Sequence, residues 1–91
     1  MKFRHLEYFV AAAEELNFSH VAGRMHVSQL SFSRQIHALE GELSAELFER
    51  QSKGVILTPA GTAFLIDARR ILEDAAASVQ KARRLSQGKK R

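Results

Sequence analysis

The chain has 91 residues, of which 45% are hydrophobic and 26% charged; it contains no cysteine and carries a formal net charge of +4. This length suffices for one small domain, and the lack of cysteine excludes disulfide bonds and thiolate metal sites. No apolar run approaches the roughly 18 residues of a membrane span, and the first residues form no apolar signal core, so we expect a soluble, cytoplasmic protein.

The positive charge is concentrated in the second part of the chain. Residues 1–58 contain six basic and seven acidic side chains, whereas residues 59–91 contain eight and three. The net charge alone is therefore weak evidence for a nucleic-acid partner, and the positions of individual basic residues matter more.

Two helices are predicted near the N-terminus. Residues 4–15 place apolar side chains at i, i+3, i+4 and i+7, which is typical of a helix with one buried face. Ser19 can then accept a backbone N–H group and begin a short second helix that ends near Met25. Gly23 within that helix costs about 1 kcal/mol relative to alanine, so the helix depends on tertiary packing.

A third helix is predicted over residues 28–43, with Ser28 as its N-cap. One buried stripe at spacing i, i+4, i+7 and i+11 consists of Phe32, Ile36, Leu39 and Leu43. The opposite face is polar and contains Gln29, Ser31, Ser33, Arg34 and His37. Glu40 and Glu42 lie near the C-terminal end, where acids oppose the helix dipole, so only the N-terminal part favours a polyanion.

A small β-hairpin is predicted next, over about residues 47–58. Its turn lies at residues 51–54, where Gly54 supplies a positive φ. Thr58 as a cap and Pro59 at the first helical position then predict a long helix over residues 59–86. The remaining basic tail, residues 87–91, is expected to be disordered.

The long helix carries an apolar stripe of nearly heptad spacing. A module of 58 residues cannot cover a helix of this length, which favours pairing with the same helix of a second copy. The residues expected at this homodimer contact are Phe64, Leu65, Ala68, Ile71, Leu72, Ala75, Val79 and Ala82. The alternative is that the stripe packs back on its own module.

These elements together predict a mainly α winged helix-turn-helix over residues 1–58, with the helix-turn-helix at about 18–37. In such a fold the third helix fits the major groove of DNA, where Gln29 and Arg34 can pair bidentately with base edges. Small serines can bind phosphates, and cations on the hairpin can reach the backbone or a minor groove. The candidate DNA contacts are Ser28, Gln29, Leu30, Ser31, Ser33, Arg34, His37, Arg50 and Lys53.

Some of these residues also have ordinary structural explanations. Arg50 can pair with Glu46 or Glu49, and Lys53 and His37 can be merely solvated. The other histidines share no i, i+4 spacing and have no clustered acid nearby, so neither a metal site nor another cofactor is expected. Nothing supplies a nucleophile with an oriented base, so we do not expect an enzyme.

Five short motifs closely resemble LysR-type transcriptional regulators: His26-Val27-Ser28-Gln29, Ser33-Arg34-Gln35-Ile36, Ala38-Leu39-Glu40, Leu47-Phe48-Glu49-Arg50 and Leu57-Thr58-Pro59-Ala60-Gly61. The resemblance extends from Leu6 to about Leu85. It implies an N-terminal DNA-binding domain with a dimerising linker helix, acting at the bacterial nucleoid on an interrupted inverted repeat whose half-sites end in T and A. It also implies that a small-molecule inducer binds an effector domain that begins about where this chain ends.

The chain departs from the family pattern at several positions. Leu30 stands where proline is frequent, which changes the apolar surface offered to a thymine methyl group. Ser44 stands where glycine usually ends the recognition helix, so a strained corner is expected there. Gly23 and Gly41 within helices predict a marginally stable monomer. The rival hypothesis is a winged-helix protein-interaction module with only nonspecific affinity for DNA.

Overall fold

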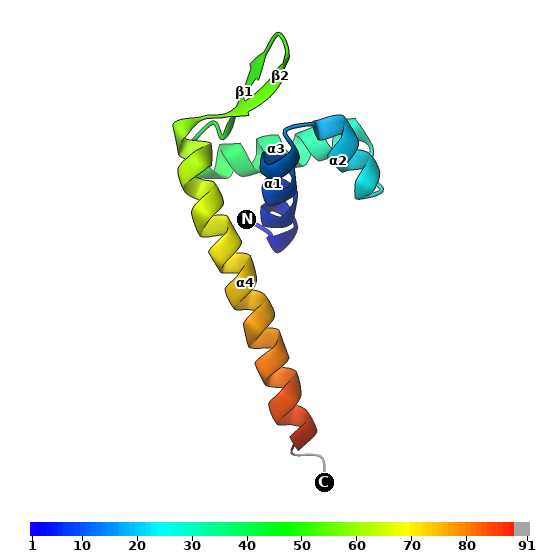
Figure 1. The fold of residues 1–91 in the computed structure, drawn as a ribbon, viewed down its shortest axis with the longest axis vertical. Coiled ribbons are helices and arrows are strands. Elements are labelled where there is room, and N and C mark those ends of the chain that lie inside the picture. The colour runs from blue at the N-terminus through cyan, green and yellow to red at the C-terminus, as the bar shows by residue number, and fades with distance from the viewer. Residues whose placement is uncertain (89–91) are drawn as a thin grey trace.

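The computed structural model describes residues 1–88. In chain order it contains helices α1 (Phe3–Glu15), α2 (Phe18–Arg24) and α3 (Gln29–Leu43), strands β1 (Phe48–Gln51) and β2 (Gly54–Leu57), and helix α4 (Pro59–Gly88). Figure 1 shows α3 crossing α1, the hairpin standing above them, and α4 extending away from this group as a rod. The prediction of a mainly helical fold with a small hairpin and a long last helix is confirmed.

Side-chain caps fix the beginnings of α3 and α4 as the sequence predicts. The Ser28 hydroxyl oxygen accepts the N–H group of Ser31 at 3.0 Å. The Thr58 hydroxyl oxygen accepts the N–H group of Gly61 at 3.0 Å, directly before Pro59 opens α4. Each bond satisfies one backbone donor that the first turn of a helix leaves unpaired.

The predicted cap of α2 is wrong. The side chain of Asn17, not that of Ser19, accepts the N–H group of His20 at 3.0 Å. The helix therefore begins at Phe18, and Ser19 lies inside its first turn. Asparagine and serine are comparable N-caps, so the sequence offered both and local preference could not choose between them.

Three helix ends carry a non-glycine residue in the left-handed region: Leu16 (φ 53°), His26 (φ 61°) and Ser44 (φ 53°). The strained corner expected at Ser44 is present. Its N–H group donates to the carbonyl of Gly41 at 3.2 Å, and that of Ala45 donates to Glu40 at 3.1 Å, which together form a Schellman end. The turn between α2 and α3 closes through His26 in the same conformation.

The hairpin is antiparallel and pairs Phe48 with Leu57 and Gln51 with Gly54. Gly54 has a φ of 133°, as the predicted turn requires. Lys53 thus lies at the tip. We call this hairpin, residues 48–57, the wing.

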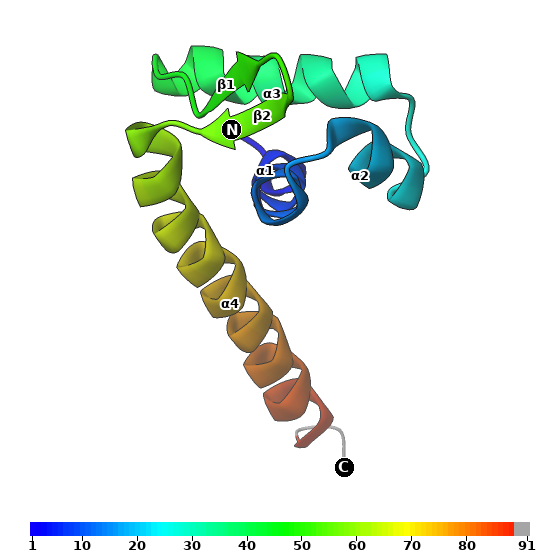
Figure 2. The ribbon, with the colours of Figure 1, turned by 45° about the horizontal axis from the view of Figure 1, so that its top comes forward.

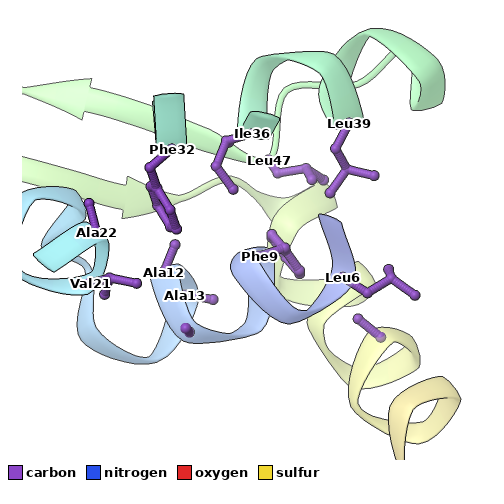
Figure 3. Close-up of a cluster of buried hydrophobic side chains, with 12 residues drawn as sticks. Leu6, Phe9, Ala12, Ala13, Val21, Ala22, Phe32, Ile36, Leu39 and Leu47 are labelled. Atoms are coloured by element: carbon purple, nitrogen blue, oxygen red, sulfur yellow. The ribbon is translucent and has the colours of Figure 1, made fainter. Parts of the chain in front are cut away.

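The core is formed where α1, α2, α3 and the segment before β1 meet (Figure 3). Phe9, Phe32 and Leu39 have no exposed surface, and Leu47 is 1% exposed. Aromatic rings link the elements at centroid distances of 5.0 Å (Tyr8–Phe32), 5.5 Å (Phe9–Phe48), 5.2 Å (Phe9–Phe64), 5.5 Å (Phe18–Phe32) and 5.1 Å (Phe18–Phe48). The predicted α3 stripe is buried except at its end, where Leu43 is half-buried.

Helix α4 packs its first half on α1 and leaves its second half projecting (Figure 2). Ala68 is completely buried within the chain, and Phe64, Leu65 and Leu72 are half-buried against the same core. The predicted dimer stripe is therefore divided, because the helix packs on its own module as far as Leu72. Helix α4 also runs past the predicted end, through Gly88, and residues 89–91 of the expected tail lie outside the described residues.

No helix within residues 1–88 is both long and apolar enough to cross a membrane.

Candidate nucleic-acid interface

The first turns of α3 present an exposed polar face because Phe32 and Ile36 turn the opposite face into the core. Gln29 and Arg34 are exposed, and Leu30 is 61% exposed. The remaining predicted contacts on this helix are Ser28 and His37, which are exposed, and Ser31 and Ser33, which are half-buried. Since Ser28 caps the helix, its hydroxyl oxygen already accepts one hydrogen bond.

The wing supplies two further exposed cations. Lys53 lies at its tip, and Arg50 lies on β1 opposite Val55. Among the described residues, no carboxylate lies within 4.0 Å of Arg34, Arg50 or Lys53. The alternative in which Arg50 pairs with a neighbouring glutamate is therefore not what the structure adopts, and all three charges are free to meet an anion.

A surface hollow between the start of α2 and the wing brings predicted contacts together. It is lined by Leu16, Asn17, Phe18, Ser19, Gln29, Arg50, Lys53, Gly54 and Val55. A smaller hollow between α3 and the wing includes His37 and Arg50. The fold thus gathers residues of α3 and the wing that lie about twenty positions apart in the sequence.

The sequence analysis missed two polar residues at this hollow. Asn17 and Ser19 line it beside Gln29 and the wing cations, whereas Ser19 was considered only as a helix cap. The available signal was their position immediately before the first helix of a helix-turn-helix, an element that commonly crosses the DNA backbone.

Elsewhere the described acids are paired away from this face. Glu15 binds both His20 and Arg24, and Glu14 binds Arg69 at 3.0 Å. At the far end of α3, a 2.9 Å hydrogen bond from the N-terminal ammonium lowers the pKa of the Glu42 carboxyl. Charge on α3 is therefore polarised, with free cations toward its beginning and the wing, and acids toward its end.

This arrangement suits a polyanion with a groove. An exposed helix carrying glutamine and arginine can enter the major groove and pair with base edges, and cations on a neighbouring hairpin can neutralise phosphates. The described residues contain no group of three or more side chains able to hold a metal ion.

Comparison with known proteins agrees with this geometry. Residues 3–62 match the family model of bacterial regulatory helix-turn-helix proteins of the lysR family. Over 88 residues, 97% of the chain, it is 58% identical to the transcriptional regulator TfdS of Cupriavidus pinatubonensis and 51% identical to ClcR of Pseudomonas putida. The chain spans about 30% of the length of each of these relatives.

Solved structures of similar proteins include complexes with DNA. The chain is 50% identical to the protein in a CbnR_DBD–DNA complex, with a TM-score of 0.90, covering 94% of this chain and 99% of that one. It is 40% identical to the protein in a complex of BenM_DBD with catB site 1 DNA, with a TM-score of 0.92, covering 97% and 95%.

Proposed function

The chain belongs to the LysR family of bacterial regulatory helix-turn-helix proteins, and we propose that it binds DNA in a sequence-specific manner as part of a transcriptional regulator. The observation that supports this most directly is the exposed, unpaired Gln29 and Arg34 on α3, flanked by the free cations of the wing. Its similarity to proteins solved as DNA complexes supports the same function.

In this proposal α3 enters the major groove with its first turns. Arg34 pairs with a guanine edge and Gln29 with an adenine edge, while exposed Leu30 contacts a thymine methyl group. Ser28, Ser31, Ser33 and His37 contact the backbone, together with the wing residues Arg50 and Lys53.

We also propose that the chain acts as a homodimer through the part of α4 that lies beyond its own core. Val79 is 48% exposed and Ile71 is 38% exposed, and both share the stripe with Ala75 and Ala82. Ala68 is completely buried within the chain, so it has no surface left for a partner. Two recognition helices would then contact half-sites about 34 Å apart or a multiple of that distance.

The longer relatives imply a further proposal about the intact regulator. We place the small-molecule inducer site in a separate effector domain and the whole protein in the bacterial cytoplasm. The part of the relatives that this chain does not span is long enough for such a domain.

The experiment that tests sequence-specific binding is fluorescence anisotropy with two duplexes at several salt concentrations. One duplex carries an interrupted inverted repeat with half-sites ending in T and A, and the other is its scrambled counterpart. We expect at least tenfold preference for the repeat, about 1.4 kcal/mol, and a salt slope that corresponds to several phosphate contacts.

Equal binding to both duplexes would be followed by selection from a random-sequence pool. Enrichment of a different repeat would show an operator code altered by Leu30. No enrichment at all would contradict the proposal and favour the protein-interaction module.

A further inference from the structure

Glu40, near the C-terminal end of α3, makes contacts that the proposed DNA interface does not use. One oxygen of its half-buried carboxylate accepts two backbone N–H groups across the following turn, that of Leu47 at 2.7 Å and that of Phe48 at 3.2 Å. These two residues lead into β1. The third helix is therefore hydrogen-bonded directly to the base of the wing.

The position of Glu40 is costly for a DNA-binding helix. An acid near a helix C-terminus opposes the dipole, and an acid beside a DNA-binding face repels phosphates. Glu40 also lines the small hollow that contains His37 and Arg50, two of the proposed contacts. Its two charge-assisted hydrogen bonds to the wing offset this cost.

Leu47 is a junction between three elements. Its N–H group donates to Glu40 of α3, and its carbonyl accepts the N–H group of Thr58 at 3.0 Å, where the wing passes into α4. Its side chain is 1% exposed, in the core. Both the first and the last strand of the wing are thus held at this residue, and Glu40 supplies the connection to the recognition helix.

The wing is long enough to magnify a small error at its base. A two-stranded hairpin has little stability of its own, so its direction depends on what holds the base. Five residues separate Leu47 from the turn, which at about 3.3 Å per residue makes a lever of about 16 Å. A rotation of about 10° at the base moves Lys53 by about 3 Å, comparable with the length of the ion pair it would make.

We propose that Glu40 is a positioning residue that sets the angle between the wing and α3, so that Lys53 and the base-contacting side chains of α3 reach the same DNA together. This inference rests on the proposed function. It differs from a general role in folding, because the core of α1, α2 and α3 is formed by apolar side chains that Glu40 does not hold in place.

Two substitutions separate the reach of the side chain from its charge. Glu40→Asp keeps the charge but withdraws the carboxylate by one methylene group, whereas Glu40→Gln loses the charge but keeps an acceptor oxygen at the same reach. Lys53→Ala removes the wing charge itself, and Glu40→Asp/Lys53→Ala combines both changes. Glu49→Gln, on the exposed side of β1, is the control for removal of an acid near DNA.

The measurement is the slope of log affinity against log salt concentration, on the inverted-repeat duplex and its scrambled counterpart, with folding checked by circular dichroism. Lys53→Ala should lower the slope by about one unit on both duplexes. Glu40→Asp should lower it similarly, a change of about eightfold in affinity between 1 M and 0.1 M salt. The double variant should lower the slope no further than Lys53→Ala, and Glu40→Gln and Glu49→Gln should keep the slope of the parent.

Each other outcome overturns the inference. An unchanged slope for Glu40→Asp, or additive losses in the double variant, would show that Glu40 does not act through Lys53. A loss for Glu40→Gln as large as for Glu40→Asp would assign the effect to charge, and outright unfolding of Glu40→Asp would assign it to the whole fold. If the parent itself does not distinguish the two duplexes, the proposed function fails, whatever the Glu40 variants do.

Discussion

Arg34 is the residue on which the proposed recognition of bases most depends, because it is exposed and unpaired while its neighbours Phe32 and Ile36 hold the helix rigidly on the core. Arg34→Ala should weaken binding to the preferred repeat by about 1–3 kcal/mol and reduce discrimination against the scrambled duplex. Anisotropy titrations of both duplexes measure this. Arg70→Ala removes an exposed arginine on α4 that pairs with Asp67, and serves as the charge-matched control.

Two outcomes are informative about Arg34. Equal affinity of Arg34→Ala and the parent for the repeat would count against base recognition by this side chain. A similar loss on both duplexes would assign Arg34 to a phosphate instead of a base.

Ser44 carries a cost that glycine would remove. It adopts φ 53° and ψ 42° at the end of α3, in the left-handed region that costs a side-chain-bearing residue about 1–2 kcal/mol. Since glycine loses more conformational freedom on folding, Ser44→Gly should raise the free energy of unfolding by about 0.5–1 kcal/mol. Urea unfolding at one protein concentration checks this through a higher midpoint at unchanged m-value.

The matched control for Ser44→Gly is the same substitution within a helix. Ser78 is exposed on α4, and Ser78→Gly should lower stability by about 0.5 kcal/mol. A lower midpoint for Ser44→Gly would mean that the hydrogen bonds of the Schellman end, and not the backbone conformation of Ser44, decide stability there.

At the scale of elements, the sequence predicted best those features that depend on neighbouring residues. The caps Ser28 and Thr58 and the turn glycine Gly54 are each determined within a few positions, and all three are confirmed. The role of Glu40 could not be predicted in this way. Local reasoning sees only an acid opposed to a helix dipole, whereas its partners lie on the far side of a turn whose path is set by packing.

The division of the apolar stripe on α4 was hidden from the sequence for a similar reason. A heptad pattern is the same whether its first half packs on α1 or on a second chain, because both surfaces are apolar. The burial of Ala68 and the contact between Phe9 and Phe64 reveal which part is covered by the chain itself. Of the candidate site, the exposed face of α3 and the wing cations followed from the sequence, but the shared hollow with Asn17 did not.

Gly61 allows α4 to begin directly against the base of the wing. A Cβ atom built at this position would lie 2.1 Å from the carbonyl oxygen of Leu47, so the two elements could not remain at their present separation. Gly61→Ala should therefore destabilise the protein by about 1–3 kcal/mol, as overpacking typically does. Gly41→Ala is the control, since nothing lies within 4 Å of its Cβ position, and it should stabilise α3 by about 1 kcal/mol.

Thermal or urea unfolding of the two glycine variants gives the comparison directly. Opposite signs for Gly61→Ala and Gly41→Ala are expected. Equal stabilisation by both would show that α4 can shift away from Leu47 at little cost, and would weaken the view that this residue joins the wing to α4.

At the scale of the whole molecule, α4 carries apolar surface well beyond the core that it covers. The molecule measures 60 Å along its longest axis but only 27 Å and 20 Å across, and the projecting part of α4 accounts for this shape (Figure 1). Val79 and Leu85 are 48% and 59% exposed on this part. Exposed apolar stripes of this kind are usually covered by a partner helix, which supports the proposed homodimer.

Ile71 lies where α4 leaves its own core and is 38% exposed on the proposed dimer stripe. Ile71→Asp would bury a carboxylate against a second apolar helix, which is costly without a partner charge, so the dimer should dissociate. Light scattering should then report a mass lower by about half. Ile66→Asp is the control, because Ile66 is 63% exposed on a different face of α4 and should leave the mass unchanged.

The same variant tests whether dimerisation and recognition are coupled. Two linked half-site contacts bind about 10²–10⁴-fold more tightly than one, so Ile71→Asp should reduce affinity for the full repeat to that for a single half-site while leaving the half-site affinity itself unchanged. An unchanged mass for Ile71→Asp would exclude this stripe as the dimer contact. A halved mass with undiminished affinity for the full repeat would show instead that each copy binds its half-site independently, and that the length of α4 serves another contact.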